Sequence, residues 1–271
     1  MMKKMDDQEI KDVELHVLKT LTDYCDRNEI RYFLSYGTLI GAVRHQGFIP
    51  WDDDVDVIVP RPDYMRLMKL LGDQEIDSCR LSSPYNNLNH FLPYSKIYHV
   101  GTKKVEQGVQ YRGNPLGIDV DIFPLDGVPE DAFKAEKFYK IQKSLFRWAV
   151  LSFSPYQKAS NPFRTVLRYI RMFLLKCIGN YRWILLLNKR AMKYSYENAK
   201  MVGVPVIGYD DVLKRINRNC FEDSIPVSFE GRIYAAPKGY DEFLRKIYGD
   251  YMQLPPEEKR VSTHLYEAYW R

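Results

Sequence analysis

The chain has 271 residues, 45% of them hydrophobic and 28% charged, which is the composition of an ordinary globular protein with a sizeable core in one or two domains. Its four cysteines are far apart and form no C-x-x-C pair, so we expect reduced thiols in a cytoplasmic protein and no disulfide framework. The N-terminus lacks the apolar region of a secretory signal, and no run of about 18 apolar residues occurs, so we expect neither a signal peptide nor a membrane-spanning helix.

The first elements predicted along the chain are a helix, a strand and a second, shorter helix. Residues 8–25 have apolar side chains at helical spacing and a polar opposite face. Residues 30–36 are predicted as a strand, and the Gly-Thr turn at 37–38 then leads into a short helix that ends near His45. A loop with glycine and proline follows, before a strand that ends at Val59.

The strand that ends at Val59 begins with alternating aspartates. Asp52, Asp54 and Asp56 share one face if the chain is extended there. Like charges on one face are unfavourable unless a cation lies among them, and hard carboxylate oxygens favour Mg²⁺ or Mn²⁺ over zinc. A solvated acidic edge is the alternative, which the apolar residues between the aspartates disfavour. We therefore expect a divalent-metal site here.

A second pair of carboxylates lies on a strand predicted at residues 116–123. Its period-two pattern buries the alternating apolar residues and places Asp119 and Asp121 together on the other face. Pro124 and the Asp-Gly turn at 126–127 are expected to end this strand. A solvent-facing strand surface is the alternative interpretation of the pair.

The remaining predicted elements are mostly helical. They are a helix from Pro62 to Leu71, a strand at 91–100, basic helices at 131–150 and 163–196, a helix at 209–217, a hairpin at 226–237 and a helix at 241–248. This mixture predicts an α+β fold with a mixed β-sheet, flanking helices and a basic helical insertion. We divide the chain into a catalytic core (1–130), a basic, aromatic-rich helical segment for membrane or acceptor contact (131–200) and a C-terminal part that completes the catalytic domain (201–271).

The basic segment has an unusual charge pattern. Residues 137–196 contain 13 Lys and Arg and no Asp or Glu, whereas the rest of the chain has 27 Lys and Arg against 35 Asp and Glu. A solvated helical face, a nucleic-acid surface and contact with anionic lipid are the three interpretations. We favour lipid contact because Arg164, Arg168 and Arg171 recur at helical spacing beside Leu167, as in an interfacial helix. No RNA-binding module is recognisable, so we expect no nucleic acid.

The Gly-Thr turn and the aspartates that follow it form one motif. A glycine turn before a helix, followed by a strand with alternating aspartates, resembles the signature of the nucleotidyltransferase superfamily. In that arrangement the backbone amides at Gly37 and Thr38 hold phosphate oxygens, and the aspartates hold Mg²⁺ that neutralises the same phosphates. A neighbouring strand usually supplies a third carboxylate, which is Asp121 or Asp119 here. An ordinary turn is the alternative interpretation of the Gly-Thr pair.

A longer pattern extends these motifs. It comprises S-Y-G-T-L-I-G-A-V-R-H-Q-G-F-I-P-W-D-D-D-V-D-V at 35–57, G-I-D-V-D-I-F-P-L-D at 117–126, Tyr-Gly-Asp-Tyr at 248–251 and Pro-Pro at 255–256. The pattern resembles the LicD family, phosphocholine transferases of bacterial surface glycans that are distantly related to fukutin-related ribitol-phosphate transferases. The resemblance covers residues 30–125 and 235–265. It implies a nucleotidyltransferase-like sheet, a CDP-linked donor, a divalent metal and release of CMP.

The resemblance also implies catalytic and metal-binding roles. Asp54 and Asp56 are expected to bind the metal, with Asp52 as an additional or indirect ligand. Asp121 either completes the metal site or acts as the general base toward the acceptor hydroxyl, and Asp119 is the alternative to Asp121. We therefore expect the catalytic group to be Asp54, Asp56, Asp121 and Asp119.

Other residues are expected to bind the donor. The nucleotide- and phosphate-binding group is Tyr36, Gly37, Thr38, Arg44 and Lys96. Lys96 and Arg44 are the candidates for neutralising phosphate charge, unless they are simple surface residues. A choline group favours an aromatic cage, for which Trp51 and Tyr36 are nearest in sequence. His45 and His264 are further acid–base candidates, although a histidine without a visible partner is more often structural.

These expectations combine into one function. We predict metal-dependent transfer of phosphocholine, or a related phospho-alcohol, from CDP-choline or another CDP-alcohol to a sugar hydroxyl, with Mg²⁺ or Mn²⁺ as cofactor. The acceptor is a cell-surface glycan such as lipopolysaccharide, teichoic acid or capsule, or its lipid-linked precursor. The alternatives are transfer of NMP from an NTP to a small molecule or RNA, and a non-catalytic scaffold. The expected location is the cytoplasm, with peripheral contact at the inner face of the plasma membrane.

Overall fold

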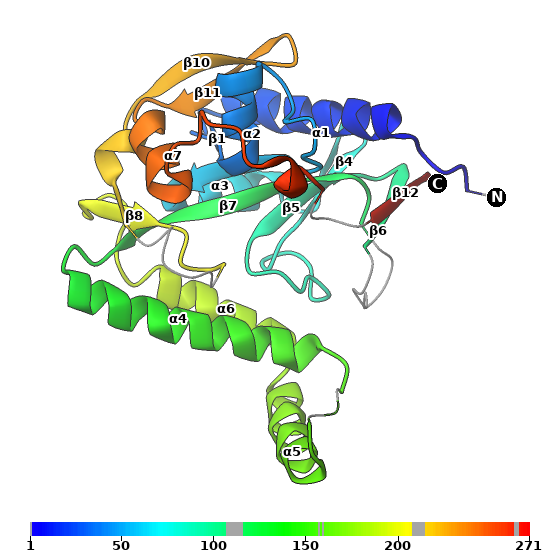
Figure 1. Ribbon diagram of the computed structural model, residues 1–271, viewed down its shortest axis with the longest axis vertical. Helices are drawn as coiled ribbons and strands as arrows, with labels where there is room; N and C mark the ends of the chain where they lie inside the picture. The colour runs from blue at the N-terminus through cyan, green and yellow to red at the C-terminus, as the bar shows by residue number, and fades with distance from the viewer. Residues whose placement is uncertain (1, 107–115, 157, 159, 208–214, 263–265) are drawn as a thin grey trace.

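The computed structural model describes residues 2–106, 116–156, 158, 160–207, 215–262 and 266–271 (Figure 1). A mixed β-sheet crosses the centre of the molecule, with helices on both sides. In the view of Figure 1, α2 (Tyr36–Ile40) and α7 (Tyr240–Tyr248) lie above strand β7, whereas α4 (Ala132–Phe153) and α6 (Asn180–Ala191) lie below it. The predicted α+β class is confirmed.

The main sheet has the strand order β1-β2-β7-β5-β4-β3, and β8 and β9 extend it beside β7. Its strands are β1 (Phe33–Leu34), β2 (Asp56–Pro60), β3 (Glu75–Ile76), β4 (Cys79–Ser82), β5 (Ser95–His99), β7 (Asp119–Val128), β8 (Met201–Gly203) and β9 (Ile216–Asn217). Two small two-stranded sheets flank it, formed by β10 (Ser224–Phe229) with β11 (Arg232–Pro237) and by β6 (Thr102–Glu106) with β12 (Tyr266–Trp270).

Strands β2 and β7 form the centre of the sheet and its parallel pair, with Asp56 opposite Asp121. Every residue of β2 is buried, and in β7 only Asp121 is partly accessible. The apolar residues expected to alternate with the aspartates, such as Val57 and Ile122, are fully buried in the core. Burial of these side chains fixes the register of the two strands, because a shift by one residue would turn every aspartate into the core.

Strand β7 continues past Pro124 to Val128, so the expectation that Pro124 and residues 126–127 end it is wrong. On one edge, β7 pairs with β5 as far as Ile122 and with β8 from Asp126 onward. Pro124 falls between these two partners, where a missing N–H breaks no ladder hydrogen bond.

The helices of the core agree with the sequence prediction. Helix α1 (Asp7–Arg27) begins with a capping box, in which the Asp6 carboxylate accepts a hydrogen bond from the Glu9 N–H, and the Glu9 carboxylate accepts one from the Asp6 N–H. Helix α3 (Arg61–Leu71) has proline in its first turn. Helix α2 continues directly into the π-helical turn η1 (Gly41–His45). The preceding strand β1 is shorter than expected, because α2 already begins at Tyr36.

In its described residues, the basic segment contains three helices instead of the two expected. Helix α5 (Pro162–Ile178) and helix α6 are separate, so the prediction of one helix over 163–196 is wrong. Gly179 lies between them with φ of +88°, a conformation that L-residues rarely adopt and that ends α5.

The C-terminal part packs back on the core. The predicted hairpin at 226–237 and the predicted helix at 241–248 are confirmed by β10, β11 and α7. The predicted helix at 209–217 falls mostly outside the described residues, and its end is strand β9, so the helix is wrong there. Two short 3-10 helices, η2 (Arg218–Phe221) and η3 (Glu257–Lys259), complete this part.

A buried ion pair joins the core to the basic helices. Both nitrogens of the Arg61 fork, Nε and Nη2, donate to the Asp126 carboxylate at 2.7 Å. Arg61 Nη1 also donates to Asn188 Oδ1 of α6 at 3.2 Å, and Asn188 Nδ2 donates to the Pro93 carbonyl at 2.9 Å. The Arg61 and Asp126 side chains are only 7% and 1% exposed. Helix α6 is therefore attached to α3 and β7 by a satisfied polar network.

Candidate functional site

The Gly-Thr turn and the aspartate segment contact each other directly. A Cβ atom on Gly37 would lie 2.3 Å from Oδ2 of Asp52, so only glycine leaves room for this carboxylate. The hydroxyl of Thr38 accepts a hydrogen bond from the backbone N–H of Asp56 at 2.8 Å. The preceding residue, Tyr36, has φ of +47°, a strained conformation for a bulky side chain. Such strain persists where the surrounding structure holds it, and it is frequent at functional sites.

The aspartates that follow do not all lie on a strand. β2 begins only at Asp56, so the prediction that Asp52, Asp54 and Asp56 alternate along an extended strand is wrong for the first two. Instead, Asp52, Asp53 and Asp54 lie in an irregular segment and each places one carboxylate oxygen within 4.8 Å of the others. Asp53, which the period-two argument passed over, also accepts a hydrogen bond from Ser262 at 2.5 Å.

Asp56 and Asp121 lie beside this trio, in register on adjacent strands, although neither belongs to the tight group. Burial, followed by the charges of Asp54 and Asp121, raises the pKa of Asp56 well above its ordinary range. Burial also raises the pKa of Asp121 to about 6, against the opposing charge of Lys96. Burial and the proximity of other carboxylates thus both oppose ionisation of Asp56.

Asp119 and Asp121, which the sequence left as alternatives, have different partners. Asp119 contacts two ammonium groups, those of Lys96 and Lys104, and the Lys104 contact is 2.9 Å. Burial alone would raise the pKa of Asp119, but Lys104 and Lys96 lower it to about 2. Asp121 lies opposite Asp56 and contacts Lys96 Nζ at 2.5 Å. Of the two, Asp121 therefore lies opposite another aspartate, Asp56, whereas Asp119 forms ion pairs with two lysines.

A cavity of about 640 Å³ adjoins the aspartate segment. Its lining includes Trp51, Arg44 and residues of the C-terminal motif noted in the sequence, among them Tyr248, Asp250 and Pro256. The charges of Asp56 and Asp52 add to the burial that raises the pKa of the Tyr248 hydroxyl, which places this hydroxyl near the carboxylates. The cavity thus combines aromatic faces with both signs of charge.

Comparison with known proteins relates this site to a family. The family model described as "LicD/FKTN/FKRP, nucleotidyltransferase domain" matches residues 29–160. The chain is 31% identical to the lipopolysaccharide cholinephosphotransferase LicD of Haemophilus influenzae over 278 aligned positions, covering 99% of both chains. The chain belongs to the LicD family. Two uncharacterized proteins, RP689 of Rickettsia prowazekii and RT0683 of Rickettsia typhi, are 28% and 26% identical over 131 residues, which is 48% of this chain and 45% and 38% of theirs.

Membership of the LicD family confirms the resemblance drawn from the motifs and the expected class of enzyme, a transferase. The matched residues 29–160 include the Gly-Thr turn, all the aspartates of the site and Lys96. The C-terminal cavity residues lie outside that range and inside the full-length alignment. Among the described helices, none has both the length and the apolar character needed to cross a membrane.

Not all of the predicted donor-binding residues line the cavity in this LicD family member. Lys96 lies on β5 beside the site, as expected, and pairs with both strand aspartates. Arg44 lines the cavity, where Nη1 donates to the Tyr251 carbonyl at 2.6 Å and Nε donates to His45 Nε2 at 2.9 Å. Tyr36 is buried against Phe123 and does not line the cavity described above. His264 lies outside the described residues.

Sequence reasoning missed Lys104 and Asp53. Lys104 lies on β6, a strand that was not predicted because its Thr-Lys-Lys-Val-Glu sequence has little apolar alternation. Its ammonium group is buried between Asp119 and the ring of Tyr266, 4.4 Å from the ring centroid. Asp53 is the middle member of a triple aspartate in the sequence. It was left out of the predicted metal ligands only because the segment was assumed to be extended.

Proposed function

We propose that this protein transfers phosphocholine from CDP-choline to a sugar hydroxyl of lipopolysaccharide or its lipid-linked precursor, releasing CMP. The observation that carries the proposal is the similarity over 99% of both chains to a protein named lipopolysaccharide cholinephosphotransferase. The geometry supports it, since the Gly-Thr turn with the strained Tyr36 before it, the aspartate carboxylates and an aromatic cavity adjoin one another.

The reaction requires that an acceptor oxygen replace CMP on phosphorus. The sugar hydroxyl attacks the choline-bearing phosphorus of the donor, a new O–P bond forms, the bridging P–O bond to CMP breaks, and the hydroxyl proton passes to a base. Asp121 is the candidate base, because its pKa of about 6 suits proton exchange near neutral pH. Lys96 holds this carboxylate in place through its 2.5 Å contact.

The carboxylate group fits a hard divalent cation such as Mg²⁺ or Mn²⁺. Asp52, Asp53 and Asp54 would hold it, with Asp56 beside them, and its charge would offset that of the donor diphosphate. We add Asp53 to the metal ligands expected from the sequence. We leave out Asp119, the alternative to Asp121, because its lysine partners satisfy its charge.

The contact between Gly37 and Asp52 gives a test of this metal site. Gly37→Ala is expected to weaken Mn²⁺ binding about 10-fold, because the added methyl group displaces the Asp52 carboxylate. Isothermal titration calorimetry measures the affinity. If glycine serves only to admit Asp52, then Gly37→Ala combined with Asp52→Ala will bind Mn²⁺ as Asp52→Ala does alone. Additive losses in the double variant would contradict this contact as the cause.

The cavity beside the aspartates is the proposed site of the donor. Trp51 and Tyr248 offer the aromatic faces, and Asp250 the negative charge, that suit a quaternary ammonium group. A thermal-shift panel of CDP-choline, CDP-ribitol, CDP-glycerol and plain nucleotides, each with Mg²⁺, tests the choice of donor. CDP-choline is expected to raise the melting temperature most. An equal or larger shift with an NTP, together with pyrophosphate release, would favour nucleotidyl transfer instead.

A lipid-linked acceptor would bring the enzyme to the inner face of the plasma membrane. The basic segment supports that location, because its cationic residues have no acidic neighbours in sequence. We propose no nucleic-acid partner, since the aromatic cavity and carboxylate site suit a small charged donor.

A further inference from the structure

We infer that the groove between α4 and α5 is a binding site for the phosphate groups of anionic lipids, and that the outer face of α5 enters the lipid surface beside it. This inference goes beyond the transfer reaction, because it assigns a membrane-docking site on a part of the molecule remote from the aspartates. It rests on three observations: the arginine groove, the exposed apolar face and the position of α5.

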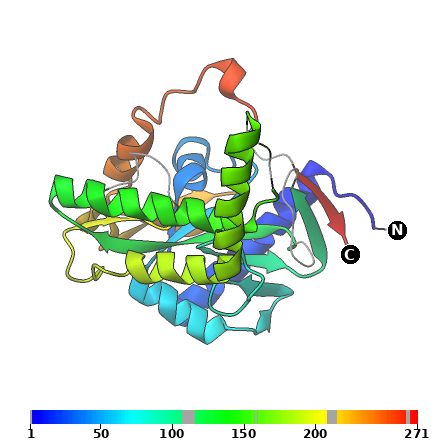
Figure 2. The same cartoon turned by 90° about the horizontal axis from the view of Figure 1, so that it is seen from below.

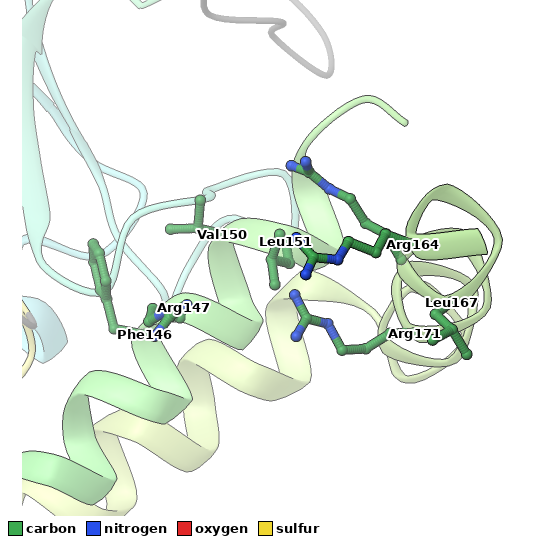
Figure 3. Close-up of a pocket in the computed structure, with 8 residues that line it drawn as sticks. Phe146, Arg147, Val150, Leu151, Arg164, Leu167 and Arg171 are labelled. Atoms are coloured by element: carbon green, nitrogen blue, oxygen red, sulfur yellow. The ribbon is translucent and has the colours of Figure 1, made fainter. Parts of the chain in front are cut away.

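The groove has a volume of about 650 Å³ and lies between the C-terminal part of α4 and the arginine face of α5. Figure 3 shows Arg164 and Arg171 extending from α5 toward α4. Half of the lining is arginine and half is apolar: Arg147, Arg164, Arg168 and Arg171, with Phe146, Val150, Leu151 and Leu167. Arginine is the side chain best suited to phosphate, because its planar fork donates two parallel hydrogen bonds.

The outer face of α5 is apolar and exposed. Of the residues in α5, only Met172 and Leu175 are buried. Phe163, Phe173 and Leu174 are 73%, 59% and 60% exposed, and they recur at helical spacing with Val166, Leu167 and Ile170. The arginines lie along one edge of this apolar face, which is the pattern of a helix that lies in a membrane interface.

Helix α5 is positioned to reach a flat surface. It projects from the body on the side away from β10 and β11 (Figure 1), and it crosses the end of α4 (Figure 2). Only two residues of α5 are buried, so the outer face of this helix is available to a partner.

Charge identifies that partner as an anionic lipid surface. No Asp or Glu occurs between Lys137 and Tyr196, and the residues that line the groove include four arginines and no acidic side chain. A second copy of the chain would bring two such segments into contact and would be repelled. Nucleic acid would satisfy the arginines but would leave the exposed phenylalanines in water. Anionic lipid satisfies both, because phosphate lies directly above hydrocarbon.

The test is co-sedimentation of the full chain with vesicles of phosphatidylcholine, with or without phosphatidylglycerol. We expect binding only to the anionic vesicles, weakened by salt. Arg147→Gln, Arg164→Gln and Arg171→Gln combined should lower the partition coefficient about 100-fold, or roughly fivefold per arginine. These three side chains are exposed, so the melting temperature should change little.

A matched control removes the same charge elsewhere. Lys69→Gln, Lys200→Gln and Lys238→Gln combined alter three exposed lysines outside α4 and α5 and should leave vesicle binding nearly unchanged. Replacement of Phe163, Phe173 and Leu174 by serine should also weaken binding, which tests the apolar face separately. Equal losses in the arginine variant and the lysine control, or unchanged binding in the arginine variant, would overturn the inference. Binding to duplex RNA without binding to vesicles would assign the arginines to nucleic acid and overturn it as well.

The vesicle-binding measurements need no donor and no turnover, and a separate activity assay completes the test. The arginine variant should still release CMP with a water-soluble acceptor at the wild-type rate and should lose rate only with an acceptor embedded in vesicles. Loss of vesicle binding with intact turnover would therefore separate the docking site from the proposed transfer reaction.

Discussion

Asp56→Asn is expected to lower the rate of CMP release by about 100- to 1000-fold without reducing stability. Asp56 is buried, and this burial, followed by the charges of Asp54 and Asp121, raises its pKa. The amide removes a negative charge from the proposed metal site, so the cation that would offset the charge of the donor diphosphate should bind less tightly. In the metal-free protein the same change relieves repulsion, so the free energy of unfolding should stay equal or increase.

Steady-state CMP release and urea unfolding together check this result. Asp73→Asn is the control, because Asp73 is exposed and outside the site. It should change neither rate nor stability appreciably. If Asp56→Asn lost activity only in proportion to lost folded protein, Asp56 would be a structural residue and its assignment to the site would fail.

Asp126→Asn should destabilise the protein by about 3–5 kcal/mol, because it leaves the Arg61 guanidinium buried without a compensating charge. The pair is almost completely buried, and both of its hydrogen bonds are 2.7 Å. Arg61 also binds Asn188, so the loss should loosen α6 and the helices attached to it. Urea unfolding at neutral pH measures the change in free energy.

Replacing both members of the ion pair by apolar residues tests the cause of this loss. Arg61→Met combined with Asp126→Leu should recover most of the stability lost by Asp126→Asn, because no charge then remains buried. A double variant as unstable as Asp126→Asn would mean that the cost comes from packing or from Asn188, and not from an unpaired charge.

Local patterns in the sequence predicted much of this fold. Helices α1 and α3, the β10–β11 hairpin and the buried faces of β2 and β7 follow from periodicity and from proline and glycine positions. Pro124 was wrongly expected to end β7. The strand tolerates this proline because it falls between the partners β5 and β8, which are distant in sequence. The break between α5 and α6 at Gly179 was not predicted, because the helical spacing of apolar residues gives no sign of its positive φ.

The sequence singled out Asp52, Asp54, Asp56 and the Gly-Thr turn as candidate site residues and passed over Asp53. The contact of Gly37 with Asp52 was not predictable, because it arises from tertiary structure. The choice between Asp119 and Asp121 depended on Lys104, which reaches Asp119 from a strand that the sequence did not reveal. Period-two reasoning also failed for Asp52 and Asp54, because the segment before β2 is irregular.

The most direct measurement is the product formed from CDP-choline with Mg²⁺ and lipopolysaccharide. We predict that CMP appears in equal amount to the phosphocholine bound to the glycan, and that chelation of the metal stops both. Release of pyrophosphate from an NTP, with no CMP from any CDP-alcohol, would contradict it.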